Sequence, residues 1–70
     1  MNAKAIKQLF EEYSRIREDA GADEVALAES ALFIEDALDI TLSDDEICQQ
    51  NLGTHRDMER FVLEKMEELG

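Results

Sequence analysis

Few residues in this chain could take part in metal binding or catalysis. Cys48 and His55 are its only cysteine and histidine, and a structural zinc site typically needs four ligands. The acidic run Asp44-Asp45-Glu46 lacks the spaced ligands and the central glycine of a calcium-binding loop. No nucleophile–base pair stands out, and a chain of 70 residues offers little room for a catalytic pocket. We therefore expect no metal site, no cofactor and no enzymatic activity.

The negative charge of the chain is concentrated between Glu18 and Gly53. This segment contains eleven acidic residues and no Lys or Arg, and it accounts for the whole formal net charge of −11. Such charge repels nucleic acid and anionic lipid, so we expect neither as a partner. The expected partner is the basic surface of another protein. A role as a mimic of DNA, blocking a basic active site, also fits the charge.

Two long helices are predicted in the first half of the chain. The first runs from about residue 3 to residue 17 behind an Asn2 cap, and Gly21 in the following break can adopt a left-handed conformation. Asp23 caps a second helix over residues 24–38. The connection of about five residues between them is short, which suits antiparallel neighbours.

A short third helix and a long last helix are predicted in the second half. Ser43 and Glu46 have the spacing of a capping box, so the third helix should open there and contain Cys48 as a small buried side chain. After a turn at 51–53, Thr54 caps the last helix over about 55–69, with His55 exposed in its first turn. The fold class is all-α, with 1–70 as a single domain.

Apolar residues recur every three or four positions along the predicted helices, which assigns their buried faces. In the first helix the stripe consists of Ile6, Leu9, Phe10, Tyr13 and Ile16. In the last helix it consists of Met58, Phe61, Val62, Met66 and Leu69. In the second helix the core face consists of Leu27, Ala31, Ile34 and Leu38, beside Ala26, Phe33 and Ala37.

The second helix carries a second apolar stripe on the opposite face. Val25, Ala28 and Leu32 follow the helical period there, and they are surrounded by Glu24, Glu29, Glu35, Asp36 and Asp39. Scattered apolar residues are normal on a protein surface, and a run of charge can be a solvated face. The alternative is a docking helix, whose apolar stripe enters a groove while its carboxylates meet Lys and Arg of a partner.

Several short segments, in order, resemble the acyl carrier protein family. They are Gly21-Ala22-Asp23-Glu24-Val25, Ile34-Glu35-Asp36-Ala37-Leu38-Asp39-Ile40, Leu42-Ser43-Asp44-Asp45-Glu46 and Asn51-Leu52-Gly53-Thr54, with Met58 and Phe61-Val62 after them. The resemblance implies a small bundle of three main helices and a short third helix, whose second helix docks on synthase enzymes. It thereby implies a partner-binding set of Val25, Ala28, Glu29, Leu32, Glu35 and Asp36.

The chain departs from this family at the point that defines it. The family attaches phosphopantetheine to the serine of an Asp-Ser-Leu signature, and the aligned residues here are Asp23-Glu24-Val25. Glu24 has no hydroxyl and cannot accept the group. The first loop is also shorter than in the family, where it helps to enclose the acyl chain. The sequence thus predicts a carrier-like, non-catalytic protein that docks on fatty-acid, polyketide or peptide biosynthetic enzymes through its acidic second helix and carries no phosphopantetheine.

Three further expectations complete the prediction from sequence. One alternative is a working acyl or aminoacyl carrier whose attachment serine is a different one, and another is an acidic inhibitor or immunity-type protein. No apolar run approaches the roughly 20 residues that span a bilayer, and no signal peptide is recognisable, so a cytoplasmic location away from the membrane is expected. The outward stripe could also serve self-association.

Overall fold

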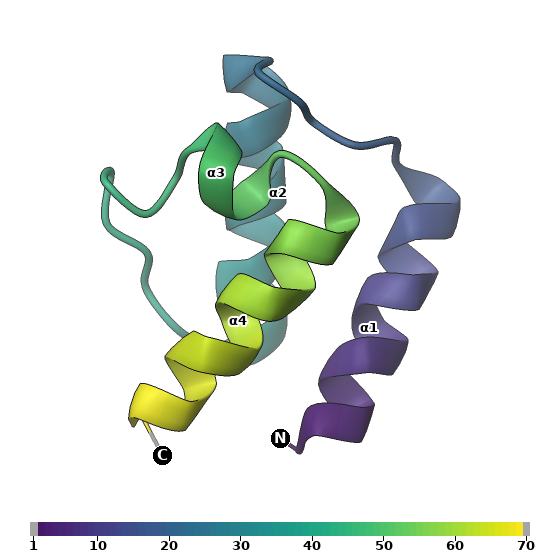
Figure 1. The fold of residues 1–70 in the computed structure, drawn as a ribbon, viewed down its shortest axis with the longest axis vertical. Helices are drawn as coiled ribbons and strands as arrows, with labels where there is room; N and C mark the ends of the chain where they lie inside the picture. Colours follow the sequence, from purple (N-terminus) through teal and green to yellow (C-terminus); the bar gives the residue numbers. More distant parts are fainter. Residues whose placement is uncertain (1, 70) are drawn as a thin grey trace.

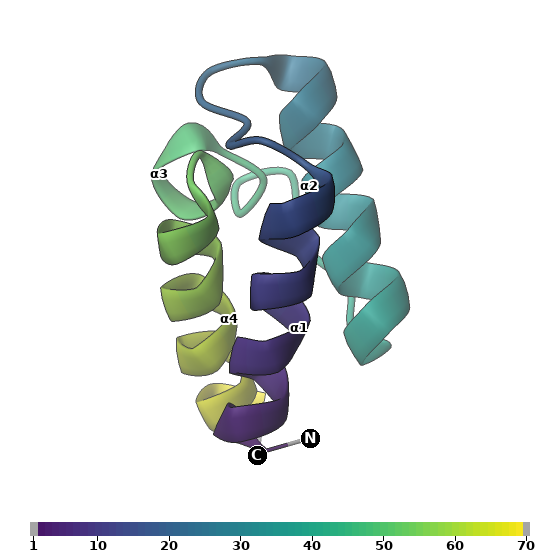
Figure 2. The same cartoon turned by 90° about the vertical axis from the view of Figure 1, so that its right-hand side faces the viewer.

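Residues 2–69 are described in a computed structural model, and within that range the chain forms four helices and no strand. The helices are α1 (Ala3–Ile16), α2 (Glu24–Leu38), α3 (Gln49–Leu52) and α4 (His55–Leu69). α1 runs antiparallel to both α2 and α4, and residues 39–48 carry the chain back along the molecule before α3 (Figure 1, Figure 2). The predicted all-α class is confirmed. The radius of gyration is 10.9 Å, close to the ~11 Å expected for a compact chain of this length.

The predicted starts of the three long helices are confirmed by their caps. The Asn2 side chain accepts a hydrogen bond from the Ala5 N–H at 2.8 Å, and Asp23 accepts from two N–H groups in the first turn of α2. Thr54 Oγ1 accepts from the Asp57 N–H at 3.0 Å at the start of α4. Gly21 has a φ of +58°, as predicted, and its N–H donates to the Gly53 carbonyl at 2.7 Å. That bond ties the first connection to the turn before α4.

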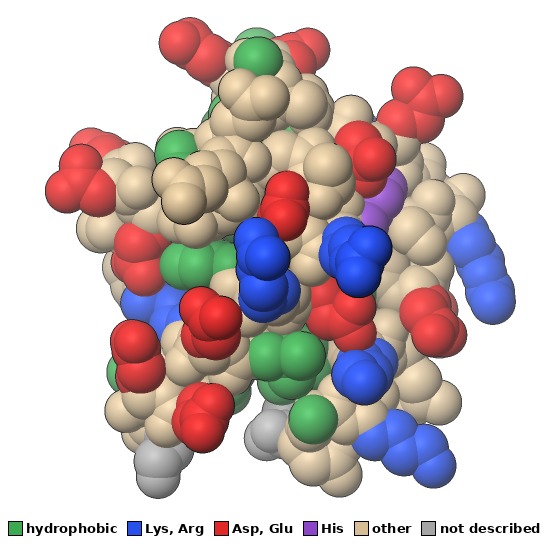
Figure 3. All heavy atoms as spheres, viewed as in Figure 1, with side chains coloured by type: hydrophobic (Ala, Val, Ile, Leu, Met, Phe, Trp, Pro, Cys, Tyr) green, Lys and Arg blue, Asp and Glu red, His purple; other side chains and the backbone are tan. Residues whose placement is uncertain are grey.

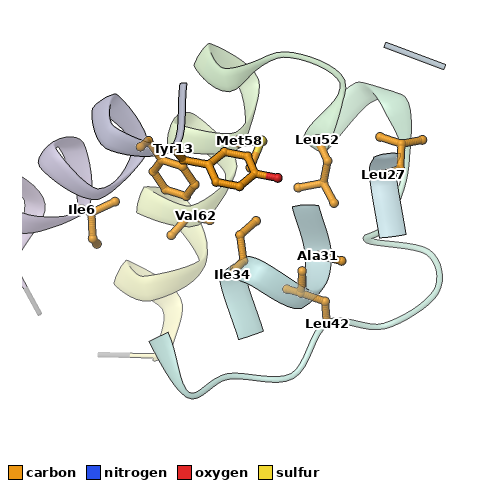
Figure 4. Close-up of a cluster of buried hydrophobic side chains, with 10 residues drawn as sticks. Ile6, Tyr13, Leu27, Ala31, Ile34, Leu42, Leu52, Met58 and Val62 are labelled. Carbon is orange, nitrogen blue, oxygen red and sulfur yellow. The ribbon is translucent and has the colours of Figure 1, made fainter. Parts of the chain in front are cut away.

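The core lies where α1, α2 and α4 meet, closed at one end by α3 (Figure 4). Its buried apolar members are Ile6, Phe10, Tyr13, Leu27, Ala31, Ile34, Leu42, Leu52, Met58 and Val62. α1 and α2 also meet through aromatic rings, because Tyr13 stacks on Phe33 with a centroid distance of 4.1 Å. The Tyr13 hydroxyl lies 3.3 Å from that of Ser30, which is also buried. This hydroxyl pair lets two polar groups enter the core without losing their hydrogen bond.

Two residues of the apolar stripes assigned to the core are exposed, and the others are buried or half-buried. Ile16 is 77% exposed and Leu69 is 62% exposed. Each is the last residue of its helix, α1 or α4. The helical period assigns a residue to a face, but a face at the end of a helix is covered only if another element reaches it. No element covers these two side chains within the described range.

The third helix was predicted too early in the chain. The Ser43 N–H does donate to the Glu46 side chain at 2.9 Å, which is one half of a capping box. The Ser43 hydroxyl donates to the same carboxylate at 3.2 Å, and the Glu46 N–H donates to the Ser43 carbonyl, so only a single turn is enclosed. The backbone is extended at Cys48, and α3 then occupies Gln49–Leu52, whose last two residues were predicted to lie in a turn. Cys48 is half-buried and precedes α3 rather than lying within it. The predicted bond from the Ser43 N–H to Glu46 was therefore correct, and the predicted helix after it was wrong.

His55 is not the exposed residue that was predicted. Its side chain is only 19% exposed, and its Nδ1 lies 2.7 Å from Asp19 Oδ1. The same carboxylate oxygen accepts the His55 backbone N–H at 2.8 Å. Asp19 thus caps α4 from the first connection, 36 residues earlier in the chain. The imidazole ring packs edge-on to the Tyr13 ring with a centroid distance of 5.6 Å.

Glu46 fixes the long connection to α4 and should make stability depend on pH. Its carboxylate accepts bonds from Lys65 Nζ at 2.7 Å and from the Ser43 N–H, and these bonds lower the pKa of Glu46 below its usual 4.5. A carboxylate whose pKa is lower in the folded than in the unfolded state stabilises the folded protein at any pH above the unfolded-state pKa. This stabilisation is lost as the pH falls through the folded-state pKa. We expect Glu46→Gln to cost about 1 kcal/mol at pH 7 and progressively less below pH 4.5.

Urea unfolding of both proteins between neutral and acidic pH measures this difference. Glu68→Gln is the matched control, because it removes the same charge from an exposed position near the end of α4. A difference between wild type and Glu46→Gln that stays constant down to acidic pH would contradict the assignment.

Asp39 ends α2 in a conformation that glycine adopts more easily. It has a φ of +53°, and its negative charge lies at the negative end of the helix dipole. We expect Asp39→Gly to raise the free energy of unfolding by about 0.5–1 kcal/mol, after subtracting the extra chain entropy of glycine. Asp39→Asn removes only the charge and should recover a few tenths of a kcal/mol. Urea denaturation of the three proteins tests this, and a destabilised glycine variant would refute it.

Candidate partner-binding surface

The outer face of α2 comprises the six residues predicted to bind a partner, and they lie along one side of the helix. They are Val25, Ala28, Glu29, Leu32, Glu35 and Asp36, of which all but the half-buried Glu35 are exposed. Val25 is 68% exposed and Leu32 is 60% exposed. α2 forms one edge of the bundle in Figure 2, so this side of the helix has no neighbouring helix in the described chain.

The packing of α2 against the core fixes the direction in which this outer face points. Leu27, Ala31 and Ile34 are buried on the opposite side of α2, and Phe33 packs on the rings of α1. With 100° between successive residues, Val25 and Leu32 then point away from the core. Rotating α2 to bury them would expose Ile34, which is completely buried. The apolar stripe is therefore held at the surface by the packing of the other face.

Two of the four carboxylates in α2 have partners inside the protein. Glu29 accepts a hydrogen bond from Arg17, at the end of α1, with a distance of 2.6 Å. Glu35 accepts the Leu42 N–H at 2.9 Å and so caps a free backbone group of the long connection. Among the described residues, Glu24 and Asp36 make no side-chain hydrogen bond or ion pair. They lie 12 residues, or about 18 Å, apart along the helix, on either side of the apolar stripe.

All seven Lys and Arg residues of the chain lie outside α2. α2 contains no base, and its last turn and C-cap bring together Glu35, Asp36 and Asp39. Each carboxylate there is unfavourable by about 0.3–1 kcal/mol because it lies near the negative end of the helix dipole. The Lys and Arg side chains gather over α1 and α4, where acidic side chains of α4 are interspersed with them (Figure 3). The negative charge at the C-terminal end of α2 therefore opposes the helix dipole in the free protein.

The position expected for a prosthetic group lies at the start of this face. Glu24 is exposed in the first turn of α2, directly after the capping residue Asp23. Ser30 is the only serine within α2, but it is 4% exposed and its hydroxyl is engaged with Tyr13. Ser43 is exposed, and its hydroxyl and N–H both bond to Glu46.

The site residue that the sequence did not reveal is Arg17. The first helix was predicted to end at about residue 17, with no role for Arg17. Its bond to Glu29 joins residues 12 positions apart across the 17–23 connection. The only signal in the sequence was that Arg17 is the last base before the acidic segment.

The remaining expectations concern metals and membranes. Among residues 2–69, no three His, Cys, Asp or Glu side chains are grouped so that they could hold a metal ion. Within the same range, every helix is too short or too polar to cross a bilayer.

Comparison of the chain with protein-family models, with curated proteins and with solved structures gave no match.

Proposed function

We propose that this protein is a carrier-like docking protein without cargo, which binds a basic surface on a biosynthetic enzyme through the outer face of α2. One observation carries the proposal: Val25 and Leu32 are largely exposed on a helix without bases. They lie between Glu24 and Asp36, whose carboxylates have no partner among the described residues. An apolar centre with a charged rim is the usual composition of a protein-binding surface. Catalysis would come from the partner, and no phosphopantetheine would be carried.

The electrostatics of α2 support binding to a basic partner. Carboxylates at the end of a helix reduce the stability of the free protein, and complementary Lys or Arg residues on a partner would remove that penalty. Charge of one sign also accelerates association with an oppositely charged surface, and that acceleration falls as salt rises. The proposal therefore requires binding that weakens with ionic strength and retains an apolar component at high salt.

The positions of the serines in α2 and at the aligned site support a protein that carries no cargo. The aligned residue, Glu24, cannot form a phosphodiester, and Ser30 is buried against Tyr13. A carrier that used Ser30 would have to expose a core residue of α2 each time it was loaded. The carrier alternative therefore depends on a serine outside the helix that the family uses.

The proposal is tested by using variants of this protein as baits that capture binding partners from the cells in which it occurs. The first bait is Val25→Ser with Leu32→Ser, which keeps the charge but removes the apolar stripe. The second is Glu24→Lys with Asp36→Lys, and Glu67→Lys with Glu68→Lys is its control, because it changes the net charge equally on α4. A biosynthetic enzyme retained by wild type and by the control, but lost by both α2 variants, would support the proposal.

Direct titration of that purified enzyme then gives the size of the effect. We expect each α2 variant to raise the Kd by about 10–100-fold and the control to change it by less than about threefold. Equal binding of all variants would exclude the outer face of α2. A nuclease or another nucleic-acid-binding protein as the partner, displaced by DNA, would instead establish the acidic-inhibitor alternative.

A further inference from the structure

Among the carboxylates of α2, Glu29 is the one that is paired with a base of the described chain. Its Oε2 lies 2.6 Å from Nη1 of Arg17, the residue that follows α1. Glu35 instead accepts a backbone N–H, and Glu24 and Asp36 make no side-chain hydrogen bond or ion pair with the described residues. A guanidinium of the protein itself therefore neutralises one of the carboxylates on the outer face of α2.

The neutralised carboxylate lies in the middle of the apolar stripe. Glu29 is four residues after Val25 and three before Leu32, and side chains at these spacings on a helix are neighbours. Arg17 reaches Glu29 from outside α2, across the 17–23 connection, and places a positive charge beside the proposed binding surface. A Lys or Arg of a basic partner is repelled by this charge and finds Glu29 already bonded.

The bond between Arg17 and Glu29 is exposed and therefore exchangeable. The two side chains are 57% and 44% exposed. Solvent screens an ion pair in such a position, and both side chains lose freedom when they pair, so the pair contributes little to stability. The end of α1 is also held by Tyr13, which stacks on Phe33 of α2, so loss of the bond leaves the two helices joined. Arg17 can thus release Glu29 while the protein stays folded.

We propose that Arg17 is an autoinhibitory contact of the partner-binding surface: it occupies Glu29 in the free protein, and a Lys or Arg of the partner displaces it. The inference rests on the proposed function and specifies the charges that its surface presents. On binding, Glu29 joins Glu24 and Asp36 as a third carboxylate for the partner. Charge complementarity selects a basic segment as the ligand, because only a cation can take the place of the guanidinium. Arg17 thereby sets the affinity of the surface from outside α2.

Two glutamine variants separate the release of Glu29 from a simple change in net charge. Arg17→Gln removes the guanidinium that bonds to Glu29. Arg15→Gln removes an equal charge from the exposed last turn of α1, where the Arg15 side chain makes no hydrogen bond or ion pair with the described residues.

The ligand in this test is a fluorescent amphipathic peptide of about four turns, with Leu on one face and Lys on the other. A scrambled peptide of equal composition is its control. Anisotropy gives the Kd at about 0.15 M salt, where screening limits the effect of net charge alone. Circular dichroism verifies that each variant is folded.

We expect Arg17→Gln to lower the Kd of the amphipathic peptide about threefold and Arg15→Gln to leave it within about 1.5-fold. In a Glu29→Gln background the two variants should bind within about 1.5-fold of each other, because Arg17 then has no carboxylate to occupy.

The outcomes distinguish a failure of the autoinhibitory contact from a failure of the proposed function. Equal Kd values for Arg17→Gln and Arg15→Gln, or weaker binding by Arg17→Gln, would overturn the role of Arg17. A gain from Arg17→Gln that persists in the Glu29→Gln background would also overturn it, because Arg17 would then act by repulsion alone. In each of these cases the proposed function stands if Glu24→Lys with Asp36→Lys loses binding. Equal affinity for the scrambled peptide, or no binding by wild type and Arg17→Gln, would overturn the proposed function and the inference with it.

Discussion

Glu24→Ser combined with Val25→Leu is expected to yield a protein that is modified with phosphopantetheine to completion, whereas the wild-type protein is expected to accept none. The two changes restore an Asp-Ser-Leu sequence behind the capping residue Asp23. The new hydroxyl would lie in the first turn of α2, at a position that is exposed and beside the outer face. Under the proposed function the recognition helix is retained, so the missing hydroxyl is the only barrier to transfer.

Intact-mass spectrometry after incubation with coenzyme A and a broad-specificity phosphopantetheinyl transferase measures the result. The matched control is Glu24→Ala with Val25→Leu, which makes the same changes without a hydroxyl and should gain no mass. Modification of the wild-type protein would identify it as a working carrier with another attachment site. No modification of the serine variant would mean that α2 is not recognised as a carrier helix, and the carrier-like part of the proposal would then fail.

The long helices were predictable because their signals are local. Asp23 bonds to N–H groups two and three residues later, and the period that assigns Leu27 and Ile34 to the core acts within one helix. The errors occur where distant segments decide the outcome. Whether Ile16 is covered depends on the path of the next connection, and the burial of His55 depends on Asp19, 36 residues away. Neither dependence leaves a periodic pattern.

For the candidate surface, too, some features could be predicted from the sequence and others could not. Its orientation follows from helical geometry, and the exposure of Val25 and Leu32 agrees with it. The roles of its carboxylates do not follow from geometry, because Glu29 and Glu35 find partners outside α2. As a result, the charges left for a partner are at Glu24 and Asp36. Experiments based on sequence alone would have mutated Glu35, which caps the Leu42 N–H, and would have confused a folding defect with lost binding.

Leu→Ala substitutions at three positions separate folding from binding. Leu52 is completely buried in α3, which contacts both α2 and α4. We expect Leu52→Ala to lower the free energy of unfolding by about 2–5 kcal/mol, a large part of the roughly 4–10 kcal/mol available to a domain of this size. Urea denaturation should therefore show a substantially unfolded protein near room temperature. A loss below about 1 kcal/mol would mean that α3 is not anchored by this side chain.

Leu→Ala substitutions at exposed positions should leave the stability of the fold nearly unchanged. Leu69→Ala and Leu32→Ala each remove a side chain that is about 60% exposed, so both should change stability by less than about 0.5 kcal/mol. Only Leu32→Ala should weaken partner binding, because Leu69 lies at the end of α4 and outside the proposed surface. If Leu32→Ala instead destabilised the fold as strongly as Leu52→Ala, its side chain would be a core residue. The outer face of α2 would then have no apolar centre with which to bind.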